Sequence, residues 1–430
     1  MKTKLVIFGI TGDLSRRKLL PALNHIYATG RFDDLEVIGV SRHEVDCRAL
    51  LNESIGNDTI ADKISIFTMN LAEEADYQRL KERIALTDDE QLLINLAVPP
   101  VATQQIVDLL GDAGLNGKNV KLLFEKPFGF DLESARDVIA RTAAHYSEEQ
   151  VYRIDHYLAK EMAQNIVVIR GANAIFQHIW NKHSIESIEI TAAESIGIEG
   201  RVQFYEQTGA LRDVLQGHLL QLLALTLADI PKDFDWSQLP KLRLAALQKI
   251  RLADPDKAVR AQYNGYEQEV DNLDSQTETF VSLELESESP EWADVPIRLT
   301  TGKALDKKLT EICINLRPVD EARNNKIALR IQPDEGISMD LFVKTPGYEK
   351  QIERKTFDLS FSQGQRMPDA YEQVFVDAIE GKKSLFASSD EVLRAWEIVE
   401  PIQKAWAMHH HTVRLYEKGS TIEEVCDEAQ

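Results

Sequence analysis

The chain opens with a short apolar run, a turn that contains two glycines, and a helical pattern. Residues 4–9 form the run, and the turn reads Gly9-Ile10-Thr11-Gly12-Asp13-Leu14. Large apolar side chains then recur every three to four residues until Gly30, as in an amphipathic helix. Glycines between a strand and a helix let backbone N–H groups approach a pyrophosphate at the helix N-terminus. The turn therefore predicts a nucleotide site, although its spacing is Gly-x-x-Gly and not the three-glycine fingerprint.

Strands and helices alternate through about the first 150 residues. Further apolar runs cover residues 35–40, 91–97 and 120–124. Such runs are typical of parallel strands that helices cover on both faces of the sheet. We therefore predict an α/β domain of the Rossmann type, with a doubly wound parallel sheet, over residues 1–155.

The pattern changes after residue 160. Several segments alternate apolar and polar residues, as half-buried antiparallel strands do: 185–191, 279–285, 297–300, 311–316, 326–332 and 338–344. Helical patterns accompany them at 211–227, 369–380 and 389–408. Residues 156–430 are predicted to form a larger α+β domain with a mostly antiparallel sheet.

The net charge and the cysteine content indicate which partners and which compartment suit the chain. The 430 residues carry a formal net charge of −21, which disfavours nucleic acid and anionic membranes as partners. No apolar run is long enough for a membrane span, and residues 1–9 do not resemble a signal peptide. Three scattered cysteines indicate a reducing cytoplasm. The run His409-His410-His411 is not expected to bind metal, since adjacent helical residues point in different directions, and no metal is predicted elsewhere.

Two basic residues refine the nucleotide prediction. The second predicted strand ends in Ser41-Arg42-His43, at the position where an acidic residue holds the ribose 2′-hydroxyl of NAD. A cation there suits a 2′-phosphate, so NADP is favoured. Lys126 follows the strand at 120–124 in Glu125-Lys126-Pro127, and a lysine at that end of a parallel strand reaches the ligand crevice.

The segment from Arg153 to Glu161 gathers an imidazole, a phenol and an ammonium. If the stretch after Asp155 is helical, His156 and Lys160 lie at i and i+4 on one face, with Tyr157 beside them. Together they can hold an anion such as a phosphate. Asp155 is then an N-cap, or a carboxylate that orients a histidine from elsewhere. The alternative is an ordinary surface helix.

A lone histidine lies in a helical apolar pattern farther along. His218 follows Arg212-Asp213-Val214-Leu215-Gln216-Gly217. It is either a hydrogen-bonded core histidine or a general base that takes a proton from a hydroxyl. Lys303 and Lys308 supply further cations in this acidic chain.

Seven motifs in order resemble the glucose-6-phosphate dehydrogenase family over nearly the whole chain. They are Gly-Ile-Thr-Gly-Asp-Leu (9–14), Glu-Lys-Pro-Phe-Gly (125–129), Arg-Ile-Asp-His-Tyr-Leu-Ala-Lys-Glu (153–161), Arg-Asp-Val-Leu-Gln-Gly-His (212–218), Gly-Lys-Ala-Leu (302–305), Gln-Pro-Asp-Glu-Gly (332–336) and Pro-Asp-Ala-Tyr-Glu (368–372). Two residues depart from the family pattern: Ala159 replaces a glycine and Gly217 an asparagine.

The resemblance implies a role for each matched residue. His218 is implied as the general base and Asp155 as its carboxylate partner. The implied substrate-binding residues are His156, Tyr157, Lys160, Glu194, Asp213, Lys303, Lys308 and Lys18. The implied cofactor-binding residues are Gly9, Thr11, Gly12, Asp13, Leu14, Arg42 and Lys126.

The implied reaction moves a hydride from the anomeric carbon of glucose 6-phosphate to NADP and gives 6-phosphogluconolactone. This is the first step of the oxidative pentose phosphate pathway, and the family implies a homodimer or a dimer of dimers. Two alternatives stay open: an NADP-dependent sugar oxidoreductase of the glucose–fructose oxidoreductase type, and a non-catalytic NADP-binding regulator.

Overall fold

The chain folds into two compact units. The structure is a computed structural model that describes residues 2–320, 323–361, 366–408 and 413–427. Unit 1 comprises Met1–Gly129, Glu133–Ala159 and Pro368–Val392, and unit 2 comprises Phe130–Leu132, Lys160–Met367 and Leu393–Gln430. The predicted division at 155/156 lies close to the junction at 159/160. A single cut nevertheless does not separate the units, because Pro368–Val392 returns to unit 1.

Unit 1 contains a seven-stranded sheet in the order β15-β6-β5-β4-β1-β2-β3. All neighbouring strands are parallel except β15 and β6. The strands are β1 Lys2–Phe8, β2 Leu35–Ser41, β3 Ile64–Thr68, β4 Glu90–Leu96, β5 Val120–Phe124, β6 Val151–Ile154 and β15 Phe386–Ala387. Since β1 lies between β2 and β4, the strand order reverses there, and ligands of such sheets bind beyond the carboxyl ends at this point.

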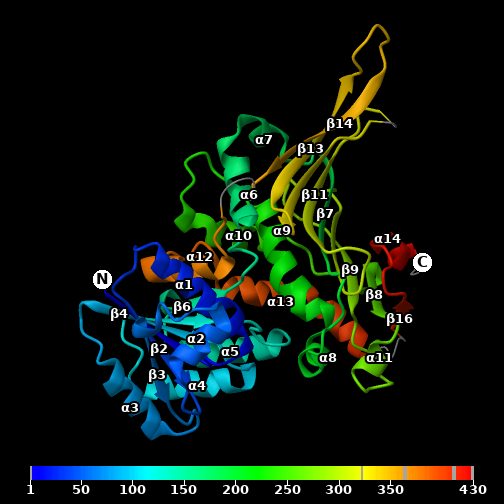
Figure 1. The fold of residues 1–430 in the computed structure, drawn as a ribbon. Coiled ribbons are helices and arrows are strands. Elements are labelled where there is room, and N and C mark those ends of the chain that lie inside the picture. Colours follow the sequence, from blue (N-terminus) through cyan, green and yellow to red (C-terminus); the bar gives the residue numbers. More distant parts are fainter. Residues whose placement is uncertain (1, 321–322, 362–365, 409–412, 428–430) are drawn as a thin grey trace. The chain divides into compact units, whose positions relative to one another are not determined.

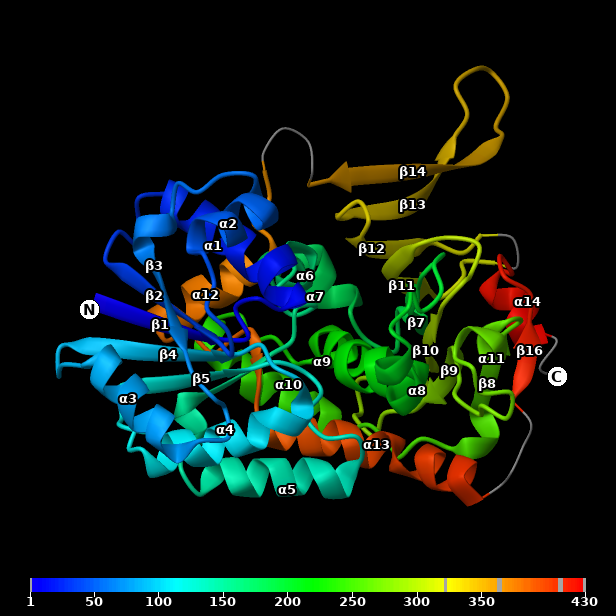
Figure 2. The ribbon, with the colours of Figure 1, turned by 60° about the horizontal axis from the view of Figure 1, so that its bottom comes forward.

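The helices of unit 1 cover both faces of this sheet (Figure 2). They are η1 Ser15–Leu19, α1 Leu20–Ala28, α2 Cys47–Ile55, η2 Ala61–Lys63, α3 Glu74–Ile84, α4 Pro100–Asp112, α5 Leu132–Ala143, η3 Glu148–Gln150 and α12 Ala370–Glu380. The second half of β1, residues 5–8, is apolar because helices cover both of its faces. Leu5 and Ile7 pack with α1 and α12, while Val6 and Phe8 pack with α3 and α4. The predicted doubly wound α/β domain is confirmed.

Unit 2 contains a nine-stranded sheet in the order β14-β13-β12-β11-β7-β10-β9-β8-β16. Its strands are β7 Ile185–Ala193, β8 Ala258–Tyr263, β9 Phe280–Leu285, β10 Ile297–Gly302, β11 Leu309–Leu316, β12 Lys326–Gln332, β13 Gly336–Lys344, β14 Ile352–Ser360 and β16 Arg414–Tyr416. The pairs β7–β10 and β8–β16 are parallel, and the other pairs are antiparallel. The predicted mostly antiparallel sheet is confirmed.

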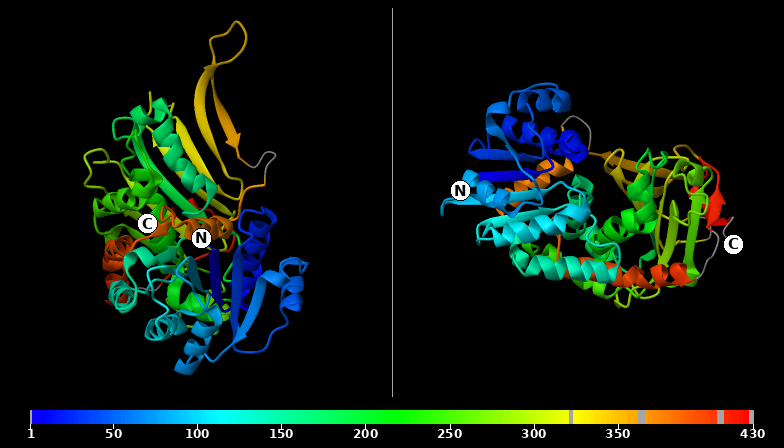
Figure 3. Two further views of the ribbon diagram at one scale, coloured as in Figure 1. Left: turned by 90° about the vertical axis from the view of Figure 1, so that its left-hand side faces the viewer. Right: turned by 90° about the horizontal axis from the view of Figure 1, so that it is seen from below.

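The helices of unit 2 include the segments that carry the second group of candidate residues. They are α6 Glu161–Ala172, α7 Ala174–Ile179, α8 Val202–Ala210, η4 Leu211–Leu219, α9 Leu220–Leu227, η5 Trp236–Gln238, α10 Leu239–Gln248, η6 Pro255–Lys257, α11 Tyr266–Glu269, α13 Ser389–Met408, whose first four residues belong to unit 1, and α14 Ile422–Asp427. The π-helix η4 packs against β7, β9 and β10. The β13–β14 hairpin extends beyond the rest of its sheet (Figure 3). No helix among the described residues has both the length and the apolarity to cross a bilayer.

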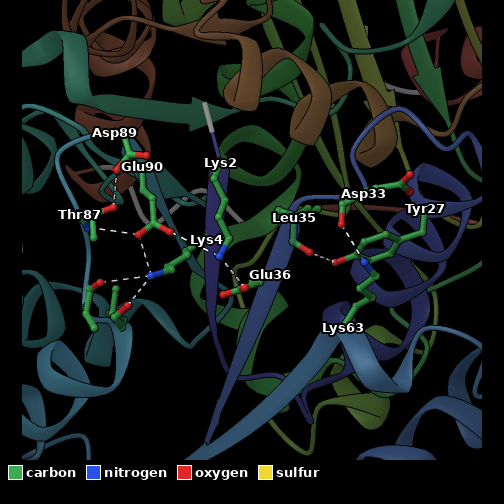
Figure 4. A network of polar contacts seen from close by, with 12 residues as sticks. Lys2, Lys4, Tyr27, Asp33, Leu35, Glu36, Lys63, Thr87, Asp89 and Glu90 are labelled. Carbon is green, nitrogen blue, oxygen red and sulfur yellow. Dashed lines mark hydrogen bonds and ion pairs between the residues drawn. The ribbon is translucent and has the colours of Figure 1, made fainter.

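A buried ion pair fastens the amino ends of β1 and β4. Lys4 is 8% exposed, and its ammonium donates to the carbonyls of Ile84 (2.8 Å) and Ala85 (3.3 Å) at the end of α3. The same ammonium lies 2.7 Å from the Glu90 carboxylate (Figure 4). Lys4 thus satisfies the last carbonyls of a helix and a buried carboxylate together.

Replacing Lys4 with Met is expected to lower the free energy of unfolding by about 3 kcal/mol at neutral pH, because Glu90 stays buried without its main partner. The hydrogen bond from Lys4 lowers the pKa of Glu90 from 4.5 to about 2. A carboxyl with a lowered pKa stabilises the fold above its ordinary pKa, and this contribution is lost as the pH falls towards 2. Urea unfolding measured from neutral pH downward should therefore show that the free energy of unfolding falls less steeply with decreasing pH in the variant than in the wild type.

Lys2→Met is the control for this experiment. The Lys2 side chain is 41% exposed and its ammonium is 3.5 Å from Glu90. An equal loss in both variants would show that burial of Lys4 does not determine the effect.

Candidate active site

The glycine turn after β1 has the geometry that a close backbone approach requires. Gly9 has φ +81°, and a Cβ atom there would lie 2.2 Å from the carbonyl oxygen of Ala97. The Gly9 carbonyl accepts hydrogen bonds from the Gly12 N–H (2.9 Å) and the Ser15 hydroxyl (2.8 Å). The helix then begins at Asp13 and Leu14. The turn therefore lies at the carboxyl end of β1, next to the point where the strand order reverses.

Arg42 is an exposed cation at the carboxyl end of the neighbouring strand. It follows Ser41, the last residue of β2. Within the part of the chain that the structure describes, Arg42 forms no ion pair, whereas Arg16 and Arg48 are paired with carboxylates. An unpaired guanidinium at this position can receive an anionic group such as a phosphate.

Lys126 and Lys18 also belong to unit 1. Lys126 is half-buried just beyond β5, so it lies at the same edge of the sheet as Gly9 and Arg42. Lys18 lies in η1, and its ammonium is 3.0 Å from the Asp369 carboxylate, which caps α12. The roles of these lysines towards cofactor and substrate stay predictions.

The stretch after Asp155 is not helical, so the condition under which His156 and Lys160 would share a helix face is not met. Residues 156–159 form a turn, residue 160 a bend, and α6 begins only at Glu161. The Asp155 carboxylate accepts a hydrogen bond from the Tyr157 N–H (2.9 Å), so it closes the turn and does not cap a helix. Aspartate side chains that bond the backbone two residues on favour such turns over helices. His156 and Lys160 are therefore not at i and i+4 of one helix.

The turn places its aromatic rings together. Tyr157 is 8% exposed, and its ring centroid lies 5.0 Å from that of His156. Ala159, which departs from the family pattern, is buried in the core beneath α1 and α12. Its methyl group is thus accommodated by apolar packing.

Lys160 directly precedes α6 in unit 2. It lies near a glutamate that the sequence motifs did not single out by role. Glu335 is 8% exposed and accepts a hydrogen bond from the Met162 N–H (2.7 Å), so it satisfies a donor in the first turn of α6. Burial raises the pKa of Glu335, and the nearby Lys160 charge opposes the rise. In the sequence, Glu335 is marked only by its place in the motif at 332–336.

His218 and Asp213 both lie in the π-helix η4, and Gly217 is accommodated within it. His218 is 5% exposed, while Asp213 is half-buried. A kink at Gly209 (φ 61°) starts this segment, and a Cβ atom there would lie 2.4 Å from a Glu278 carboxylate oxygen. Glu278 in turn accepts a hydrogen bond from the Leu211 N–H (3.1 Å). π-helical segments often occur at functional sites.

Glu194 and Lys303 lie together at the carboxyl ends of two neighbouring strands in the sheet of unit 2. They follow β7 and β10, which are parallel neighbours with Ala193 opposite Gly302. Lys303 is 3% exposed and forms an ion pair with the Glu194 carboxylate. Its ammonium lies 5.2 Å from the ring centroid of Tyr205.

Tyr205 is a neighbour of this pair that the sequence reasoning missed. Its side chain is fully buried, and its hydroxyl has no hydrogen-bond partner among the described residues. Nothing in the spacing of α8 distinguishes it from an ordinary core aromatic. Lys308, by contrast, is exposed beyond β10.

The candidate residues thus form two groups, each described by itself. The carboxyl edge of unit 1 carries Gly9, Thr11, Gly12, Asp13, Leu14, Arg42, Lys126, Asp155, His156 and Tyr157. Unit 2 carries Lys160, Glu194, Asp213, His218, Lys303 and Lys308. The pairing of Asp155 with His218 joins residues of different units and stays a prediction.

A cavity of about 680 Å³ lies at the opposite edge of the unit 1 sheet, among the amino ends of β1, β2 and β3. Part of its charged lining is paired internally, for example Lys2 with Glu36 at 2.8 Å (Figure 4). This edge is the wrong one for a nucleotide in a parallel sheet. The cavity is therefore not the candidate site.

No metal centre is found among the described residues, because no three His, Cys, Asp or Glu side chains gather with suitable geometry there. His409, His410 and His411, which were not expected to bind metal, lie outside the described residues.

Known proteins resemble the chain along nearly its whole length. The model described as "Glucose-6-phosphate dehydrogenase, NAD binding domain" matches residues 6–165, and the model of the C-terminal domain matches residues 167–429. A glucose-6-phosphate 1-dehydrogenase of Dickeya dadantii is 33% identical, covering 97% of this chain and 94% of the relative. Glucose-6-phosphate 1-dehydrogenase 2 of Mycobacterium tuberculosis is 34% identical, covering 97% and 90%.

Solved structures agree with these matches. The crystal structure of glucose-6-phosphate 1-dehydrogenase from Mycobacterium avium has a TM-score of 0.87 and 33% identity, covering 97% of this chain and 94% of the other. A glucose-6-phosphate dehydrogenase in complex with its substrate glucose-6-phosphate has a TM-score of 0.91 and 29% identity, covering 100% and 98%. The two family models, the relatives and these structures together show that the chain belongs to the glucose-6-phosphate dehydrogenase family, whose members are oxidoreductases of carbohydrate metabolism.

Proposed function

We propose that this chain oxidises glucose 6-phosphate at the anomeric carbon with NADP as the hydride acceptor and forms 6-phosphogluconolactone. This is the first step of the oxidative pentose phosphate pathway. The observation that supports the substrate most is the grouping of Glu194 and Lys303 at one sheet edge. It occurs in a chain whose whole length aligns with a relative solved with glucose 6-phosphate.

His218 is proposed as the general base. It takes the proton of the anomeric hydroxyl while the hydride leaves the same carbon, and a histidine is suited to proton transfer near neutral pH. Asp155 is proposed to orient the His218 ring and to stabilise its charged form. A bound nicotinamide supplies the hydride acceptor, whereas the protein supplies the base and the positioning.

The remaining candidate residues are proposed to bind the two ligands. His156, Tyr157 and Lys160 hold the phosphate, and the sugar is contacted by Glu194, Asp213, Lys303, Lys308 and Lys18. The turn Gly9, Thr11, Gly12, Asp13 and Leu14 holds the pyrophosphate of the cofactor, together with Lys126. The positive φ of Gly9 and its close approach to Ala97 support this assignment.

Replacing Arg42 with Ala tests the preference for NADP. The variant is expected to bind NADP roughly 10- to 100-fold more weakly, because a charge-assisted bond to the 2′-phosphate is lost. NAD, which has no such phosphate, should be affected much less. Steady-state kinetics with each cofactor measure the ratio.

Arg48→Ala is the matched control, since Arg48 is an exposed arginine already paired with Asp58 and Asp62. Equal loss for NADP and NAD in the Arg42 variant would refute the 2′-phosphate assignment.

The substrate is tested by comparing glucose 6-phosphate with free glucose in the presence of NADP. Turnover of the phosphate alone supports the proposal. Turnover of free glucose but not of its phosphate would indicate an oxidoreductase of the glucose–fructose type. Cofactor binding without turnover of either sugar would indicate a regulator.

A homodimer, or a dimer of dimers, is proposed for the assembly. Strand β14 is an edge strand whose Ile352, Phe357 and Leu359 are each more than half exposed, and such edges favour association. A monomer mass by light scattering would contradict it. A cytoplasmic location is also proposed, because all three cysteines are free thiols.

A further inference from the structure

Helix α12 comes from late in the chain but belongs to unit 1. It is drawn in orange among the blue elements of the N-terminal region (Figure 1) and packs against α1 and η1. Two side chains from the sheet hold its C-terminal end. Lys121 of β5 donates to the Ala378 carbonyl (2.7 Å), and Gln91 of β4 donates to the Ile379 carbonyl (2.8 Å). These bonds satisfy carbonyls that a helix end leaves without partners.

The N-terminal end of α12 is held by different elements. Its capping residue Asp369 pairs with Lys18 of η1, and Glu372 lies 3.2 Å from the His25 ring of α1. Between them, the Tyr371 hydroxyl donates to the Glu125 carboxylate (3.1 Å). The first turn of α12 therefore contacts both the helix after the glycine turn and the Glu-Lys-Pro turn after β5.

The cluster around Glu125 is costly for the fold. The Glu125 carboxylate lies close to the Tyr371 hydroxyl and the Asn95 amide, but one of its oxygens and both Asn95 amide atoms are buried without a hydrogen bond of good geometry in the described chain. Burial raises the pKa of Glu125 to about 7, although the Tyr371 bond acts against the rise. Buried polar atoms without partners each destabilise a protein. Packing alone would favour apolar residues here.

Tyr371 faces carboxylates from several elements. Burial raises its pKa, and the charges of Glu125, Asp369 and Asp155 raise it further. The phenol therefore stays a hydrogen-bond donor at neutral pH. The neighbouring Asp155 places this cluster beside the turn that carries His156 and Tyr157 in unit 1.

We infer that Tyr371 and Glu125 are positioning residues that hold the Glu-Lys-Pro turn, and with it Lys126, in the conformation that binds the nicotinamide cofactor. Glu125 directly precedes Lys126, and its carboxylate is fixed from α12. The inference rests on the proposed dehydrogenase function. It differs from a purely structural role for α12, in which the hydrogen bond would contribute only to stability.

Tyr371→Phe removes the hydrogen bond and keeps the ring. We expect the KM for NADP to rise about tenfold, the size of a lost buried hydrogen bond. The kcat and the KM for glucose 6-phosphate should change much less. Glu125→Leu should raise the KM for NADP similarly, and Glu125→Gln, which keeps an acceptor oxygen, should raise it less.

Tyr146→Phe is the matched control. Its hydroxyl is also buried in unit 1, where it donates to the Leu115 carbonyl (2.9 Å), and it has no proposed role in binding. An unchanged KM for NADP in Tyr371→Phe, or a rise that Tyr146→Phe reproduces, would overturn the inference. Glu125→Leu with normal NADP kinetics would overturn it too.

Calorimetric titration of NADP without substrate separates this inference from the proposed function. If the wild type binds NADP but does not turn over glucose 6-phosphate, the proposed function fails. Weaker NADP binding by Tyr371→Phe than by Tyr146→Phe would still support the positioning pair, and equal binding would refute it.

Discussion

Replacing His218 with Asn is expected to lower kcat for glucose 6-phosphate by about 10²- to 10⁴-fold, the usual contribution of a general base. Asparagine is smaller than histidine but keeps a polar amide near the position of the ring Nδ1, so we expect η4 to keep its packing against β7, β9 and β10. It does not accept a proton in the working pH range. Substrate and cofactor binding should persist, because the imidazole acts on the anomeric hydroxyl during the reaction. Single-turnover kinetics and equilibrium binding separate the two effects.

Thr226→Val is the control for this experiment. Thr226 is fully buried in α9, which continues η4, and its hydroxyl donates to the Leu222 carbonyl (2.8 Å). This variant loses a buried hydrogen bond, but Thr226 has no proposed role in the reaction. Unchanged turnover in His218→Asn would leave the histidine as a core residue, the alternative that its low exposure also fits.

Replacing Lys303 with Met is expected to raise the KM for glucose 6-phosphate by roughly 10- to 100-fold, which corresponds to a lost charge-assisted bond. Lys303 is buried and is paired with Glu194. The variant leaves the Glu194 carboxylate without its cation at the edge where we place the sugar. The KM for NADP should change little, since Lys303 belongs to unit 2.

Lys307→Met provides the comparison, because Lys307 is an exposed cation four residues away with no proposed contact. Similar losses in both variants would mean that the net charge of the region attracts the substrate and that Lys303 has no specific role. Thermal unfolding of both proteins shows whether the fold is kept.

Much of the fold was predictable because its strands bury both faces or alternate regularly. The predicted ranges 120–124 and 326–332 coincide with β5 and β12, and 389–408 coincides with α13. Edge strand β14 was missed because most of its residues are exposed and its apolar side chains do not mark a core face. The return of α12 to unit 1 is a long-range contact that local periodicity does not encode.

The candidate site was predicted less completely than the fold. Residue types and motifs predicted roles for Gly9, Arg42 and Lys303, and the structure places each of them directly after a strand. A helix directly after Asp155 does not form, because the Asp155 carboxylate accepts a hydrogen bond from the Tyr157 N–H and closes a turn. Tyr205 could not be recognised, since a buried hydroxyl without a partner is visible only in three dimensions.

The most direct test of the central claim is the amount of reduced nicotinamide formed when the purified chain is mixed with NADP and a limiting amount of glucose 6-phosphate. The proposed reaction predicts one NADPH for each sugar phosphate oxidised, with free glucose giving none. Absence of NADPH from a folded protein that still binds NADP would contradict the account.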